Sequence, residues 1–337
     1  MNFLRTVMIL VFLAGFVCPA FSADPASLTV TKQVDGEIPA DIASVIHRIN
    51  SKLFESMKDN KPNIMMNMFV EEGRSDKKLE EGVKATYDKL GTLAKGTSFT
   101  MLHEYVIDVK GTGTAIVTLP GEGDSSFLIS VDAGKGPLYM SLMTSSGNFN
   151  DLILCFVYMK VKGAWQLYSF HCGIYRVSGG TAVQWYEEAL RMYDKGWDVP
   201  AMQRMQLVQS FLRPAPFIQY DKEAEITAFM KKGMEQTWKK YKFPLKATWV
   251  KGMPMIYGLD IQFVKGRLVP VVIYVTKHPI SKAIELQDEV DAITSKIGKV
   301  IPGIDKAGGE IGYRIFSEPP LDSTKEYKYR SAMSKVR

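Results

Sequence analysis

The chain has 337 residues, of which 46% are hydrophobic and 23% are charged. These proportions are those of an ordinary folded protein, so they exclude a disordered chain and a small disulfide-stapled one. The formal net charge of +6 is a mild basic excess that is far below what nucleic-acid binding requires, and we expect no nucleic-acid partner.

Residues 1–23 have the pattern of a secretory signal peptide. Arg5 supplies a positive start, and the apolar stretch Val7–Val17 has the length of a signal core. It is too short to span a bilayer, which needs roughly 20 apolar residues. We expect cleavage after Ser22 or Ala23, and a mature α+β protein that is secreted or periplasmic. Its contact with a membrane is expected to be peripheral at most.

Two alternatives to cleavage concern the same segment. The first is an uncleaved helix that anchors the chain. The second is lipidation at Cys18, but Gly15-Phe16-Val17 lacks the small residue just ahead of the Cys that the bacterial type of lipidation motif has. A soluble mature protein is therefore the leading expectation.

Three helices followed by a meander of strands are predicted for residues 38–178. Apolar side chains recur there with the spacing of one helix face, and the period then changes to the alternation of a half-buried strand. The helices are expected over residues 40–57, 64–70 and 77–93. The strands are expected over residues 99–107, 114–119, 127–131 and 138–143, followed by a hairpin of 152–161 and 165–176. A turn near Lys162-Gly163 is expected to close that hairpin.

The remaining sequence predicts a helical linker, a small α+β domain and a basic tail. The linker covers residues 181–242, with helices over 181–195, 200–212 and 221–241. The small domain covers residues 245–317, with strands over 247–250, 256–264, 268–276 and 309–316 and a helix over 281–300. Lys265-Gly266 is expected to form a hairpin turn. Residues 318–337 are polar and basic, which favours a loose tail.

The final hairpin of the first part carries a family resemblance. Its sequences Met159-Lys160-Val161-Lys162-Gly163-Ala164-Trp165 and Trp165-Gln166-Leu167-Tyr168-Ser169-Phe170, together with the order of helices and strands, resemble the nuclear-transport-factor-two-like superfamily. The resemblance covers residues 38–178 and implies a cone-shaped α+β domain. That superfamily includes small-molecule enzymes and members without chemistry, and its isomerases and dehydratases place acidic residues or a His–Asp pair inside the cone. We match no such pair to this sequence.

His103, Tyr105 and His171 are the candidate ligand-binding residues. His103 and Tyr105 share the apolar face of their strand, where an imidazole and a phenol bind or polarise a small ligand. The alternative is that they are core residues whose polar tips find backbone partners. The four histidines are too scattered for the close spacings of zinc ligands, so we predict no metal site.

Cys155 and Cys172 form a candidate disulfide in the long hairpin. A loop centred between Gly163 and Ala164 places the two cysteines opposite each other. A tight turn at Lys162-Gly163 instead places Cys155 opposite Phe170 and leaves the cysteines diagonal, which is hard to bridge. Two buried free thiols are the alternative.

A basic segment lies between Met230 and Gly252. Its Lys239, Lys240 and Lys242 stand among aromatic residues, a composition that suits an anionic envelope surface such as lipid headgroups. The alternative is a solvated helix face whose aromatic side chains pack inward.

No catalytic, phosphate-binding or dinucleotide-binding motif occurs, and no cofactor is predicted. Our leading hypothesis is an exported, non-catalytic accessory or binding protein of the cell envelope, whose partner is a small molecule or an envelope component. The alternative is an isomerase, dehydratase or hydrolase that uses a pocket in the N-terminal domain, with His103 or a nearby acid as general base. A third hypothesis is a structural role through the second domain and the basic segment.

Overall fold

The computed structural model describes residues 28–94, 98–123, 125–145, 150–322 and 324–336. The predicted signal peptide therefore lies outside the described residues. The chain is a mixed α+β protein, and its described residues divide into two compact units, one within residues 28–179 with 211–221 and one within residues 180–210 with 222–336. Among the helices in the described part, none combines the length and the apolar character needed to cross a membrane.

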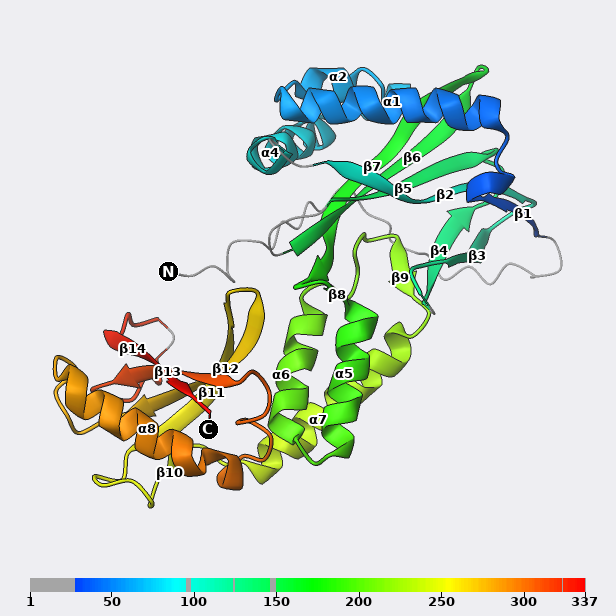
Figure 1. Cartoon of the computed structure of the whole chain (residues 1–337). Coiled ribbons are helices and arrows are strands. Elements are labelled where there is room, and N and C mark those ends of the chain that lie inside the picture. The colour runs from blue at the N-terminus through cyan, green and yellow to red at the C-terminus, as the bar shows by residue number, and fades with distance from the viewer. Residues whose placement is uncertain (1–27, 95–97, 124, 146–149, 323, 337) are drawn as a thin grey trace. The chain divides into compact units, whose positions relative to one another are not determined.

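The helices of the first unit lie on one face of a curled antiparallel sheet, as Figure 1 shows. They are α1 (Ala40–Lys58), α2 (Pro62–Met66), α3 (Glu71–Arg74) and α4 (Lys77–Ala94), preceded by the short 3-10 turn η2 (Asp35–Glu37). The sheet contains β1 (Thr29–Val34), β2 (Phe99–Lys110), β5 (Leu138–Ser145), β6 (Asn150–Val161) and β7 (Ala164–Val177), which lie in that order. Side chains from α1, α4, β5, β6 and β7 form the buried core between the two layers.

The predicted second helix ends earlier than expected. Pro62 occupies the first turn of α2, where its missing N–H costs nothing, and α2 stops at Met66. The chain then runs extended beside β7, because the Leu167 N–H donates to the Met68 carbonyl (2.8 Å) and the Val70 N–H donates to the Leu167 carbonyl (2.9 Å). Residues 68–70 therefore add a short parallel pairing to the edge of the sheet.

A second, smaller sheet completes the first unit. It consists of β3 (Thr114–Pro120), β4 (Ser126–Asp132) and β9 (Ile218–Tyr220). The predicted single meander is therefore divided between two sheets. β2 pairs with β5, and the intervening strands β3 and β4 pair with each other in the smaller sheet. β9 comes from the segment 211–221, far along the chain, and pairs with β4.

The second unit combines helices with a five-stranded mixed sheet. After β8 (Gly180–Thr181) it contains α5 (Ala182–Asp194), α6 (Asp198–Gln209), α7 (Glu223–Lys240) and α8 (Ala283–Val300). The sheet has the order β10 (Leu245–Lys246), β11 (Met255–Val264), β12 (Arg267–Val275), β13 (Glu310–Phe316) and β14 (Tyr329–Lys335). β12 and β13 are parallel and α8 connects them. The predicted strand over 247–250 is a turn, and β10 lies just before it.

Two expectations for this half of the chain differ from the structure. The helices between residues 181 and 242 are not separate from the following domain: Val199 of α6 lies in the same buried core as Tyr274 and Ile293, and the Gln203 side chain donates to the Asp260 carbonyl (2.8 Å). The expected loose tail contains β14, which pairs with β13 along seven residues. Ala332 and Ser334 face inward, and the residues on either side of them are exposed. This alternation is typical of an edge strand, and it lets the basic segment pair with the sheet.

Candidate functional site

A buried carboxylate lies on the helix-covered face of the sheet in the first unit. Glu104 of β2 accepts a hydrogen bond from the Tyr139 hydroxyl of β5, and its Oε2 lies 2.7 Å from Nε2 of His47 on α1. The Glu104 side chain is 12% exposed and the His47 side chain is 49% exposed. Burial, and then the hydrogen bond to Glu104, raise the pKa of the Tyr139 phenol far above its usual range. The phenol therefore acts as a hydrogen-bond donor at every ordinary pH.

A second polar group on the same face joins α1 to the middle of the sheet. The Asn50 amide donates to the Ser141 hydroxyl (3.0 Å), and the Tyr158 hydroxyl donates to the Asn50 carbonyl oxygen (2.5 Å). All three side chains are buried. Because every one of them has a partner, the group orients α1 without the penalty of an unsatisfied buried polar atom.

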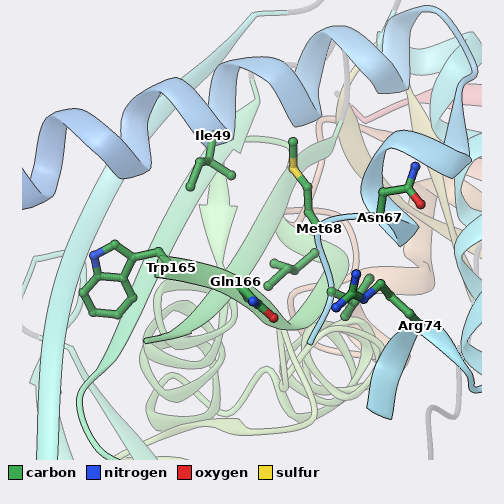
Figure 2. Close-up of a pocket in the computed structure, with 8 residues that line it drawn as sticks. Ile49, Asn67, Met68, Arg74, Trp165 and Gln166 are labelled. Atoms are coloured by element: carbon green, nitrogen blue, oxygen red, sulfur yellow. The ribbon is translucent and has the colours of Figure 1, made fainter. Parts of the chain in front are cut away.

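Next to these groups, the surface of the first unit has a hollow of about 300 Å³, which we name the Trp165 hollow. Figure 2 shows it between α1, the extended chain after α2 and the start of β7. Its lining residues are Ile49, Asn67, Met68, Phe69, Arg74, Trp165, Gln166 and Leu167. The Trp165 ring stands edge-on to the Tyr139 ring, with centroids 5.9 Å apart, so the hollow adjoins the buried Glu104 group.

The charges around the Trp165 hollow are positive. Arg74 is exposed, and its guanidinium forms no ion pair with any residue that the structure describes. Lys160 Nζ lies 5.9 Å from the centroid of the Trp165 ring, a distance at which a cation is attracted to an aromatic face. No acidic side chain is among the lining residues. The site therefore offers an apolar wall, two amides and an available cation.

His103 and Tyr105 lie on the opposite face of β2 from the helices, because side chains alternate along a strand. His103 Nδ1 is 2.9 Å from Asp35 Oδ2, and its Nε2 is 3.2 Å from the Gly121 carbonyl oxygen. The Tyr105 hydroxyl donates to the Pro120 carbonyl (2.6 Å). Tyr105 is thus a buried residue with a backbone partner, whereas His103 is partly exposed and contacts both a backbone carbonyl and the Asp35 carboxylate.

His171 also lies on the face away from the helices. It is paired in register with Cys155 on β6, and burial lowers its pKa from 6.5 to about 4. The three predicted ligand-binding residues therefore do not line the Trp165 hollow, and the structure places them on the other side of the same sheet.

Cys155 and Cys172 are free thiols in the structure, so the candidate disulfide is not formed. Lys162 and Gly163 form the tight turn, with φ of 49° and 85°, and pair Val161 with Ala164. A bulge between Val157 and Tyr158 then shifts the register by one residue. Cys155 consequently faces His171 while Cys172 faces Leu154, and the two thiols point to opposite faces of the sheet.

Two of the three candidate lysines for an anionic surface have acidic partners in the second unit. Lys239 Nζ lies 2.6 Å from Glu235 Oε1, and Lys240 Nζ lies 2.6 Å from Asp198 Oδ2. Lys242 is exposed. Binding of this segment to an anionic surface stays a prediction.

Sequence reasoning missed the residues that this face brings together. Two signals were available in the sequence: His47 and Asn50 are polar residues three apart beside the apolar stripe of α1, and Glu104 and Asp108 are acids on either side of Val106 in one register of β2. Arg74 and Trp165 carried no such signal, because only the extended chain after α2 brings them near each other.

No cluster of three or more metal-ligating side chains occurs within the described ranges. Comparisons with protein-family models, with curated proteins and with solved structures found no match.

Proposed function

We propose that this chain is an exported, non-catalytic binding protein of the cell envelope whose first unit holds a small molecule in the Trp165 hollow. The hollow itself carries the proposal, since it joins apolar side chains to a small number of polar groups, which is the usual composition of a ligand site. Its volume lies at the lower end of the roughly 300–1,000 Å³ typical of such sites, which favours a small ligand.

We further propose that the first unit is related to the nuclear-transport-factor-two-like superfamily. The order of helices, followed by a curled sheet that they cover on one face, supports this relation. The strand β1 ahead of α1 and the separate sheet of β3, β4 and β9 are features that the resemblance did not anticipate.

Native mass spectrometry of the protein purified from its own compartment tests the binding function. We expect an adduct with one small molecule on the wild-type chain and its loss in Trp165→Ala, because the indole forms one wall of the hollow. Trp238→Ala, in the second unit, is the matched control and is expected to keep the adduct. A wild-type protein that carries no adduct and takes up none from an extract of that compartment would contradict the proposal. The same spectra give the mature N-terminus, expected after Ser22 or Ala23.

The Glu104 group favours a second candidate function, an enzyme of the isomerase, dehydratase or hydrolase type. Glu104 holds Nε2 of His47, which leaves the other ring nitrogen of a half-exposed imidazole to act as a general base. In this candidate Glu104 orients His47, and the His47 imidazole takes the place of His103 or a nearby acid as the general base, whereas His103 is engaged on the opposite face. If the chain has a turnover, His47→Gln is expected to abolish it with folding intact and His103→Gln is not. The reverse result would contradict this assignment.

A further inference from the structure

We propose that the ligand of the Trp165 hollow is a small amphiphile with one carboxylate group and an apolar, preferably aromatic, body. This inference rests on the proposed binding function. It follows from how the two kinds of lining residue are separated within the hollow. Figure 2 shows Trp165 at one end, with Ile49 above, and Arg74 with Asn67 at the other end.

The apolar end suits a flat hydrocarbon body. Trp165 and Ile49 bring an indole ring and a branched aliphatic chain to this end, and Figure 2 shows the thioether side chain of Met68 between Ile49 and the polar end. Met side chains adapt to irregular ligand shapes, and aromatic rings pair favourably edge-on or offset. A body without hydrogen-bonding groups is favoured there, because the indole N–H of Trp165 is the one strong hydrogen-bonding group that these three side chains offer.

The polar end suits a carboxylate. A guanidinium presents a planar fork of N–H donors that matches the two oxygens of a carboxylate. The side-chain amides of Asn67 and Gln166 also line the hollow, and neither has a hydrogen-bond partner among the described residues. Each amide contributes N–H donors to the lining, in addition to those of the Arg74 guanidinium.

The charges in and beside the lining favour an anionic ligand. Arg74 is the single cation in the lining, and Lys160 adds a second positive charge on the side of Trp165. The acids that precede Arg74 on α3, Glu71 and Glu72, are exposed and do not line the hollow. A cationic ligand would meet like charge at both ends, and a neutral one would leave the Arg74 fork unused.

Calorimetric titration of the full chain with three probes tests the inference. The probes share a naphthalene ring and differ in charge: 2-naphthoate, 2-naphthamide and 2-naphthylmethylammonium. We expect 2-naphthoate to bind about tenfold more tightly than the amide, which is the size of effect for a charge-assisted hydrogen-bonded pair that remains partly exposed. The ammonium probe is expected to bind more weakly than the amide. The preference for naphthoate should shrink as salt is added.

Variants test whether Arg74 causes the preference for naphthoate over the amide. Arg74→Gln is expected to remove the tenfold difference and to leave amide binding unchanged, whereas Trp165→Ala is expected to weaken both probes together. Arg191→Gln, an exposed arginine of α5, is the charge-matched control and should change neither. Equal binding of naphthoate and amide that Trp165→Ala abolishes would overturn the carboxylate assignment and leave the binding function standing. Binding of none of the probes, in a protein that also carries no native adduct, would overturn both.

Discussion

Single polar side chains decide how the first unit places α1 on its sheet. Asn50 satisfies Ser141 on β5 and Tyr158 on β6 with one amide group, and Glu104 satisfies both Tyr139 and His47. Losing one partner of a buried polar pair leaves the other unsatisfied, at about 1–3 kcal/mol. These residues therefore fix the position of the helix that forms one wall of the Trp165 hollow, as well as adding stability.

His171 predicts a dependence of stability on pH. Its pKa is about 4 in the folded chain because burial disfavours the imidazolium, and it is 6.5 when unperturbed. Between these values the unfolded chain binds a proton that the folded chain does not, so stability falls as the pH falls from 6.5 toward 4. The shift corresponds to about 3 kcal/mol at full effect. Urea unfolding between pH 7.5 and pH 4 should therefore show a steeper loss for wild type than for His171→Gln.

The other titrating groups are common to both proteins, so their contributions cancel in the difference between the two pH profiles. At pH 7.5 the imidazole is neutral in both states, and the comparison there isolates the packing cost of the substitution. Parallel profiles for the two proteins would show that His171 is not buried as a neutral side chain.

For single residues, the sequence predicted which side chains of β2 are buried on one face, but not which face of the strand the helices cover. The pattern of His103, Tyr105 and Ile107 correctly indicated one inward side of β2, yet Glu104 and Val106 are also inward on the other side. A strand covered on both faces carries apolar residues in both registers, so periodicity alone does not tell which face the helices cover.

Turn chemistry determines how well the elements follow from the sequence. Lys162-Gly163 and Lys265-Gly266 form the tight turns expected, with positive φ at both residues of each pair. The register beyond the turn did not follow, because the bulge at Val157 has no local sequence signal and shifts Cys155 from Phe170 to His171. Bulges respond to the curvature of the whole sheet, which a single hairpin does not encode.

The edge strand β14 gives the clearest test at the scale of elements. We expect a chain that ends at Ser317 to lose stability in the second unit and to aggregate, because removing β14 exposes the edge of β13 and uncovers Ile311 and Ile315. The soluble fraction after expression and the melting temperature measure this. A control chain that ends at Val336 keeps β14 and the hydrogen bond from Val336 to Gly309, and should behave as wild type. If residues 318–337 were a loose tail, the two truncated chains would be equally soluble and stable.

On the scale of the whole molecule, the chain does not complete one unit before it starts the next. Residues 211–221 belong to the first unit although α5 and α6 before them and α7 after them belong to the second. Composition and periodicity gave no sign of this return, since a three-residue strand such as β9 is too short to carry a pattern. The buried Ile218 and Tyr220 reveal it only through their partners on β4.

The returning segment predicts that a substitution far along the chain weakens the first unit. Ile218 is fully buried and pairs with Ile129 on β4, so Ile218→Asp places a charge in an apolar site, at a cost of about 3 kcal/mol or more. Hydrogen exchange followed by mass spectrometry should show faster exchange of β3 and β4 amides in this variant than in wild type. Gln219→Asp, on the same strand but only half-buried, is the matched control and should leave their exchange unchanged. If residues 211–221 were only a connection between helices, neither variant would alter the hydrogen exchange of β4. If β9 is part of the small sheet, Ile218→Asp should speed that exchange and Gln219→Asp should not.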